Sequence, residues 1–272
     1  MFNFDSIRHM EGLMSRKKEM LASCQGEKIV LLGGSSVLYG FNTDEMQKRL
    51  GKPTINAGVN VGLGFRYLID NMEPHLKPGD HVILPLEFGQ YVNPPYYLFG
   101  FGIDMFVYRK FWASKKKYRK KLKLFLMSLR HAKSSATPEK ISHRKATVLT
   151  ETGCHQGLDA QLRDPNTLTP LSFPEEFQVT EAMDEMKAFM ARCAENNIQV
   201  TLLPPAFYAN ALSNDYLAKL YAYFRVTVSP DVFRLKASEV YDSVYHANLS
   251  GQNRVTNSLI EMLEPAAYRV GN

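Results

Sequence analysis

The stretch EKIVLLGGSSVLYG, residues 27–40, passes from an apolar run into a glycine-rich turn within a few positions. The apolar run 28–32 has the length of a buried strand, and the glycines that follow break it before a helical pattern starts near Asn42. A short apolar strand that leads through a tight turn into a helix is typical of a parallel α/β unit. Ser35 and Ser36 therefore stand at the carboxyl end of a predicted strand.

The same alternation of strand and helix continues on both sides of a long central segment. Five short apolar strands joined by helices predict an α/β fold, in which helices cover both faces of a parallel sheet in a three-layer αβα sandwich. The predicted strands are 28–32, 54–57, 81–86, 199–203 and 226–228, and the predicted helices are an amphipathic one before residue 28, then 42–50, 65–76, 174–197, 214–224 and 250–263.

The rhythm stops between about residues 91 and 173, which we interpret as a largely helical insertion over the active edge of the sheet. With 272 residues, the chain is long enough for one large core. The sequence therefore predicts a single domain, residues 1–272, with an insertion at about 91–173.

Positive charge is concentrated in residues 105–138, which contain eleven Lys and Arg and no Asp or Glu. Aromatic and aliphatic residues alternate with these charges, as in a cationic amphipathic helix or helix pair. The first interpretation is a helix with one solvated, charged face, whose apolar side packs on the domain. An anionic membrane surface and a polyanionic glycan are the alternative partners, and a nucleic acid is the least favoured because no nucleic-acid motif accompanies the charge.

Composition excludes several classes of protein. The three cysteines have no CxxC spacing and the seven histidines form no HxxH or HExxH pair, so we expect no disulfide framework, no metal and no cofactor. No apolar stretch approaches the roughly 18 residues of a membrane span. The N-terminus lacks the apolar core of a signal peptide, so we expect a cytoplasmic protein, or a periplasmic or cell-envelope one if a signal or anchor was removed.

Several polar residues follow the predicted strands and would meet at one edge, because ligands of parallel α/β sheets bind beyond the carboxyl ends of the strands. Gly58 follows the second strand, and Glu87 to Gln90 follow the third. Near the other end of the chain, Asp242 and His246 precede the last predicted helix. An early serine combined with a late Asp and His is the layout of a serine hydrolase or acyltransferase. Taken alone, the serine turn also suits a plain tight connection or a phosphate cradle.

Three of these blocks resemble the SGNH (GDSL-type) hydrolase superfamily. The sequence GSSVLYG at 34–40 resembles the first block, with Ser35 where that block has Asp, and Asn-Ala-Gly at 56–58 resembles the second. The run from Asp242 through Asn248 to Gly251 resembles the last block. The resemblance spans 28–90 and 174–263 and implies a flavodoxin-like sheet.

The resemblance implies a catalytic triad of Ser36 as nucleophile, His246 as general base and Asp242 as the group that orients the imidazole. It also implies that backbone amides of Ser36 and Gly58 donate to the oxyanion. The chain departs from the family in two ways. Asp242 lies four residues before the histidine rather than three.

The second departure is that the third block has no oxyanion asparagine and carries Glu87 and Gln90 instead. Gln90 is a candidate replacement amide. Glu87 cannot stabilise an oxyanion while ionised, so it is expected to bind a sugar hydroxyl or to belong to a changed mechanism.

The expected function is a serine esterase or O-acyltransferase that forms an acyl-Ser36 intermediate on a small or glycan ester. The alternative is a catalytically impaired SGNH-like module that binds a glycan or an anionic surface through residues 105–138.

Overall fold

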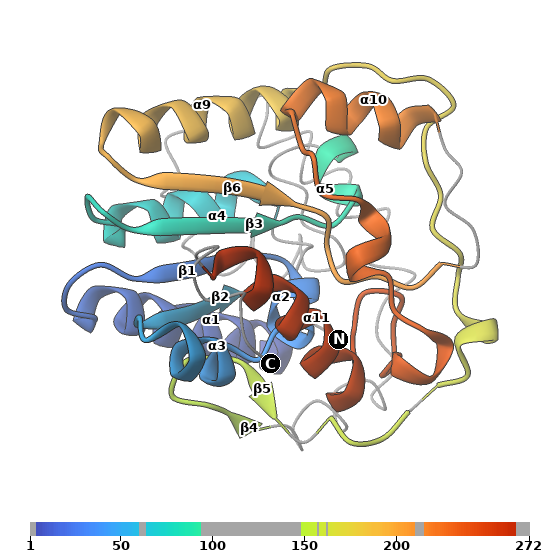
Figure 1. Cartoon of the computed structure of the whole chain (residues 1–272), viewed down its shortest axis with the longest axis horizontal. Coiled ribbons are helices and arrows are strands. Elements are labelled where there is room, and N and C mark those ends of the chain that lie inside the picture. The colour runs from blue at the N-terminus through green and yellow to red at the C-terminus, as the bar shows by residue number, and fades with distance from the viewer. Residues whose placement is uncertain are drawn as a thin grey trace.

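The computed structural model describes residues 4–59, 64–93, 148–156, 158–161, 163–209 and 215–264. The chain forms helices and strands in alternation around one parallel sheet (Figure 1). The helices are α1 Phe4–Ser23, α2 Ser35–Gly40, α3 Thr43–Leu50, α4 Phe65–Met72, α5 Gly89–Val92, α9 Glu181–Glu195, α10 Asp215–Phe224 and α11 Leu249–Leu263, with 3₁₀ turns η2 Glu73–His75, η4 Pro165–Thr167, η5 Pro230–Phe233 and η6 Ala237–Glu239. The strands are β1 Ile29–Gly33, β2 Thr54–Gly58, β3 His81–Pro85, β4 Val148–Leu149, β5 His155–Gln156 and β6 Gln199–Leu203.

The main sheet has four strands in the order β2-β1-β3-β6, and all its pairs are parallel. Figure 1 shows them side by side, from β6 at the top to β2 at the bottom. Four of the five predicted strands are confirmed in position. Their carboxyl ends lie at one edge, so the segments that follow β1, β2, β3 and β6 emerge together.

The predicted fifth strand at 226–228 is wrong, because these residues lie in a loop in the structure. The apolar Val226 instead closes the end of α10. Arg225 adopts a left-handed conformation with φ 57°, and the Val226 N–H donates to the carbonyl of Tyr221 at 2.9 Å. This is the Schellman pattern, in which an apolar residue past the helix end packs back on the helix. A three-residue apolar run does not distinguish this cap from a short strand.

Alternating strand residues supply two separate cores, one on each face of the sheet. Val30 and Leu32 pack with α1, α4, α9 and α10, whereas Ile29 and Leu31 pack with α2, α3 and α11. Because both faces are covered, the central strand β1 is apolar throughout rather than alternating with polar residues. Helices therefore cover both faces of the sheet, as predicted.

The segment after β1 is helical earlier than predicted. We expected an irregular turn up to Asn42, but α2 already begins at Ser35, with Gly34 as its N-cap. The next helix, α3, begins where expected, and the side chain of Asn42 caps it by accepting the Glu45 N–H at 3.2 Å. Both candidate serines thus occupy the first turn of a short helix.

Within the described part of the predicted insertion, β4 and β5 form a small β-hairpin. Its turn lies against the edge strand β2, where the Asn56 N–H donates to the Thr152 carbonyl at 2.8 Å. The hairpin therefore satisfies part of an otherwise open sheet edge. The basic segment 105–138 lies outside the described residues, and the single domain with an insertion at 91–173 stays a prediction. None of the described helices is long and apolar enough to cross a membrane.

Lys17 of α1 is fully buried between this hairpin and the sheet. Its ammonium donates to the carbonyls of Asn56 and Gly153. Burial lowers the pKa of Lys17 from 10.5 to about 7, with Cys154 acting against the shift and Arg16 adding to it. A lysine that gives up its proton so readily makes folding sensitive to pH.

We expect the free energy of unfolding to rise with pH between about pH 7 and 9 because of Lys17. In that window the unfolded chain keeps the lysine proton, while the folded chain loses it above a pKa of about 7. The maximum slope from one such group is about 1.4 kcal/mol per pH unit. Urea unfolding of the wild type and of Lys17→Met measures it, with Lys18→Met as the control. Equal pH slopes for the wild type and Lys17→Met would contradict the assignment.

Candidate active site

Ser36 lies directly beyond the carboxyl end of β1, in the first turn of α2. Its side chain is fully buried, and its hydroxyl donates to the carbonyl of Pro85 at 3.4 Å. The neighbouring Ser35 is partly exposed. Two hydroxyls of different accessibility therefore stand side by side where the sequence predicted one nucleophile.

His246 and Asp242 lie in the turns that precede α11. The imidazole Nδ1 is 2.5 Å from Asp242 Oδ1, and the side chain of His246 is 5% exposed. The backbone between them forms turns rather than helix, closed by the His246 N–H donating to the Ser243 carbonyl at 3.0 Å. A carboxylate on Nδ1 fixes the tautomer in which Nε2 is the basic nitrogen.

Tyr39 joins the serine helix to this histidine. It lies three residues after Ser36 on α2, so the two share a helix face. Its ring centroid is 4.4 Å from that of His246 and 5.0 Å from that of His155 in β5, which stacks on its other side with an interplanar angle of 11°. Sequence reasoning gave neither Tyr39 nor His155 a role. Tyr39 belongs to the sequence block 34–40, but nothing in the sequence marks His155 as its neighbour.

Glu87 follows β3 and turns back onto the serines. Its Oε1 accepts the Ser36 backbone N–H at 2.8 Å and the Ser35 hydroxyl at 3.0 Å, and the residue is 2% exposed. Burial raises the pKa of the Glu87 carboxyl above the usual 4.5, while the bonds from both serines and the charge of His246 act against the shift. Glu87 is therefore close to both halves of the candidate site.

Gln90 supports Glu87 from the next turn of chain. Its Oε1 accepts the Glu87 backbone N–H at 3.1 Å, which fixes the orientation of the carboxamide. Its Nε2 is buried and has no hydrogen-bond partner among the residues that the structure describes. The amide predicted as a replacement donor thus has an unused N–H₂ group close to Glu87 in the chain.

Gly58 was expected to offer its N–H to an oxyanion, but this N–H donates to Asn56 Oδ1 at 3.0 Å. The Asn56 amide also donates to the carbonyl of Val37 at 2.8 Å, so it ties β2 to α2. A side chain at Gly58 would collide with the backbone, because a Cβ there would lie 2.4 Å from the Leu38 nitrogen. Gly58 is thus explained by the close approach of α2, and its expected donor is engaged within the protein.

The structure therefore brings the predicted residues together in two groups. Ser35, Ser36, Glu87 and Gln90 are joined by hydrogen bonds, and Asp242 with His246 forms the other group. Tyr39 and the electrostatic interaction of Glu87 with His246 link the two groups. In this structure the Ser36 hydroxyl is bonded to Pro85 rather than to the imidazole.

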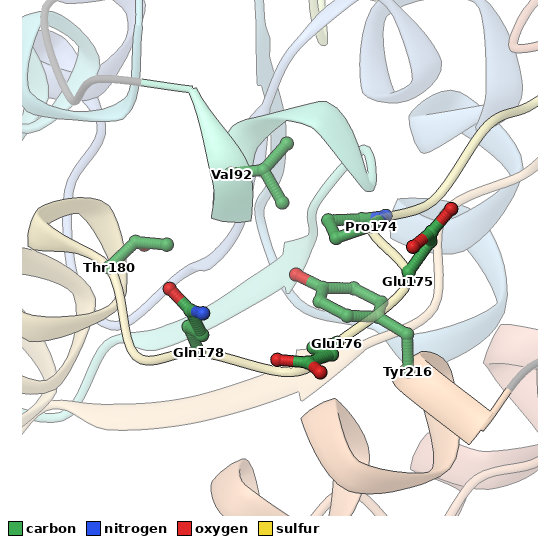
Figure 2. Close-up of a pocket in the computed structure, with 7 residues that line it drawn as sticks. All are labelled: Val92, Pro174, Glu175, Glu176, Gln178, Thr180 and Tyr216. Carbon is green, nitrogen blue, oxygen red and sulfur yellow. The ribbon is translucent and has the colours of Figure 1, made fainter.

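A separate cavity of about 430 Å³ lies beside Val92, the last residue of α5. Figure 2 shows Val92 of α5 and Tyr216 of α10 on different sides of it, with the segment before α9 along the rim. It is lined by Val92, Pro174, Glu175, Glu176, Gln178, Thr180 and Tyr216. None of the predicted catalytic residues lines this cavity, although Val92 is only two residues from Gln90.

Within the described ranges, no cluster of three or more His, Cys, Asp and Glu side chains could hold a metal ion. The three cysteines all have free thiols.

Comparison with known proteins gives little further guidance. No protein-family model matches the chain, and no curated protein is similar to it. The chain is similar to a solved structure provisionally described as a platelet activating factor from Streptococcus pneumonia. The two chains are 15% identical with a TM-score of 0.38, over 95% of this chain and 94% of that chain.

Proposed function

We propose that the chain is a serine esterase or O-acyltransferase that forms an acyl-Ser36 intermediate on a small or glycan ester. The observation that supports this proposal is the His246–Asp242 contact at 2.5 Å, together with the 4.4 Å between the ring centroids of His246 and Tyr39, a residue of the helix that begins with the serines. Such a pair serves to take a proton from a hydroxyl that is otherwise a poor nucleophile.

The reaction assigns one task to each residue. Ser36 Oγ forms a bond to the ester carbonyl carbon while its proton passes to His246 Nε2, and the carbonyl π electrons move to the oxygen. When the intermediate collapses, the ester C–O bond breaks and the leaving alkoxide takes the proton from the imidazole. Asp242 stabilises the imidazolium between these steps. Water or a sugar hydroxyl then releases the acyl group, which distinguishes a hydrolase from a transferase.

The proposed reaction requires the Ser36 hydroxyl to change its hydrogen-bond partner. The Ser36 hydroxyl must leave the Pro85 carbonyl, to which it is bonded at 3.4 Å, and turn toward His246. A bond of that length is weak, and rotation about χ1 moves the oxygen between staggered positions without moving the backbone. Binding of an ester over α2 would favour the turned position.

The test is covalent trapping of the intact chain with a serine-reactive fluorophosphonate, followed by mapping of the adduct. We expect the label on Ser36, its loss in Ser36→Ala, and its retention in the matched control Ser35→Ala. Hydrolysis of p-nitrophenyl acetate should follow the same order. An adduct on Ser35, or equal hydrolysis by the wild type and Ser36→Ala, would overturn the assignment.

A second candidate function is favoured by the way the site is filled. The Ser36 N–H and the Gly58 N–H are both bonded within the protein, to Glu87 and to Asn56. An SGNH-like module that has lost catalysis and binds an anionic glycan or surface through residues 105–138 would have such a site. Absence of any serine label, together with salt-sensitive polysaccharide binding that weakens when Lys115, Lys116 and Lys117 become Gln, would favour it.

A further inference from the structure

The candidate site has a shortage of oxyanion donors. A tetrahedral intermediate at Ser36 carries a negative oxygen, which needs hydrogen-bond donors at about 2.7–3.1 Å. The Ser36 N–H is already bonded to Glu87 Oε1 at 2.8 Å, and the Gly58 N–H to Asn56 Oδ1 at 3.0 Å. Residues 85–90, at and after the end of β3, contain no asparagine, and Glu87 stands there instead. A buried carboxyl group thus lies where the missing donors are needed.

We propose that Glu87 acts as a neutral carboxylic acid whose O–H is the oxyanion donor of this site. This inference rests on the proposed esterase or acyltransferase function and adds a catalytic residue to it. The sequence excluded an oxyanion role only for the ionised carboxylate, because like charges repel. A protonated carboxyl has the opposite polarity toward the oxyanion, since it presents a hydrogen.

The contacts of Glu87 show which of its oxygens would carry the proton. Both hydrogen bonds, from the Ser36 N–H and the Ser35 hydroxyl, end on Oε1. Oε1 therefore has the pattern of the carbonyl oxygen of an acid, which accepts, and Oε2 is left to bear the hydrogen. The two bonds also fix the plane of the carboxyl group beside the Ser36 backbone. A donor held in place before the reaction needs no reorganisation when the oxyanion forms.

The surroundings of Glu87 shift its carboxyl toward the neutral form relative to an exposed glutamate. The residue is 2% exposed, and burial is the largest influence on its carboxyl, raising the pKa above 4.5. The ionisable groups that face it are the imidazole of His246, with Asp242 behind it, and Tyr245, whose own pKa is raised well above 10.0. The two serines that donate to its carboxyl are uncharged.

The proposed reaction requires a particular protonation state of Glu87 and His246. Catalysis needs the proton on Glu87 and a neutral imidazole that can accept a second proton from Ser36. During attack the Glu87 O–H shortens its bond to the oxyanion without transferring its hydrogen, and the Ser36 proton goes to His246. Activity is lost at the alkaline limb because Glu87 ionises.

The experiment compares Glu87→Gln and Glu87→Ala with the wild type, using p-nitrophenyl acetate hydrolysis and fluorophosphonate labelling from about pH 5 to 10. A glutamine keeps the accepting Oε1 and adds a donor that never ionises. We expect Glu87→Gln to stay within about tenfold of the wild type and to lose the alkaline limb. Glu87→Ala removes the donor and should lose about 10²–10³ in kcat. Thermal unfolding of each variant accompanies the rates.

Several outcomes would overturn the inference. Activity of Glu87→Ala equal to or above the wild type would mean that Glu87 only blocks the site. A Glu87→Gln variant as slow as the alanine variant, or one that keeps the alkaline limb, would exclude a neutral donor. If Gln90→Met is slow while Glu87→Ala is not, the donor is the Gln90 amide.

The proposed function fails by a different result. A wild-type chain that takes no label on Ser36 loses the enzyme assignment, and the role of Glu87 with it. A chain that labels on Ser36 equally well in all Glu87 variants keeps the function and loses only this inference. If Glu87→Ala does not fold, the test is the alkaline limb of Glu87→Gln: its loss supports the neutral donor, and its retention excludes it.

Discussion

Replacing Asp80 with alanine is expected to lower the free energy of unfolding by about 3–5 kcal/mol. Asp80 and Lys28 form an ion pair at 2.7 Å, and both side chains are 0% exposed. Asp80 also accepts the backbone N–H of Lys28 at 3.1 Å and that of Lys77 at 2.8 Å. One carboxylate thus fixes the entry into β1 and the turn before β3. Its removal leaves the Lys28 ammonium buried without its partner.

Chemical denaturation of Asp80→Ala measures this loss, with Asp215→Ala as the matched control. The Asp215 pair with Lys219 is solvent-exposed, with side chains 78% and 57% exposed, so its removal should have a much smaller effect. The double variant Lys28→Met/Asp80→Leu should recover only part of the stability, because no charge is left unpaired but the backbone N–H groups of Lys28 and Lys77 lose their acceptor. A single variant that unfolds at the wild-type denaturant concentration would show that the buried pair contributes nothing.

The elements that the sequence predicted correctly are those with strong local signals. Residues 199–203 form β6 with the expected bounds, and α3 begins directly after Asn42, close to the predicted start of that helix. Each of these signals is contained within a few consecutive residues. The error at 226–228 arose from the same kind of local signal, because a helix cap and a short strand both place apolar residues after a helix.

The candidate site was predicted in part, for a related reason. The sequence suggested Ser36 and His246 as site residues because each stands at a recognisable local position. Ser36 follows a strand, and His246 precedes a helix. The contact of Glu87 with the Ser36 N–H joins residues 51 positions apart, and only the register of β1 with β3 brings them together. The His155 stack on Tyr39 depends on the hairpin that lies against the sheet edge. No single-sequence pattern encodes such pairs.

Asparagine in place of Asp242 is expected to reduce catalysis by up to about 10⁴-fold while leaving the fold intact. Asp242 accepts from His246 Nδ1 at 2.5 Å, so Nε2 is the basic nitrogen. An asparagine amide of the same shape can instead donate to Nδ1, which moves the imidazole hydrogen to Nε2 and removes the base. The carboxylate charge that stabilises the imidazolium is lost as well.

The rate of fluorophosphonate labelling at Ser36 measures this effect without knowledge of the natural ester, and p-nitrophenyl acetate hydrolysis provides a second readout. Asp231→Asn is the matched control, because the Asp231 side chain is 63% exposed and pairs only with the nearby Arg234 in the same turn. Thermal unfolding should be close to the wild type for both variants, since Asp242 is at the surface side of the pair with a 22% exposed side chain. Labelling of Asp242→Asn within about tenfold of the wild type would mean that His246 does not act as the base, because a base with the wrong tautomer cannot accept the serine proton.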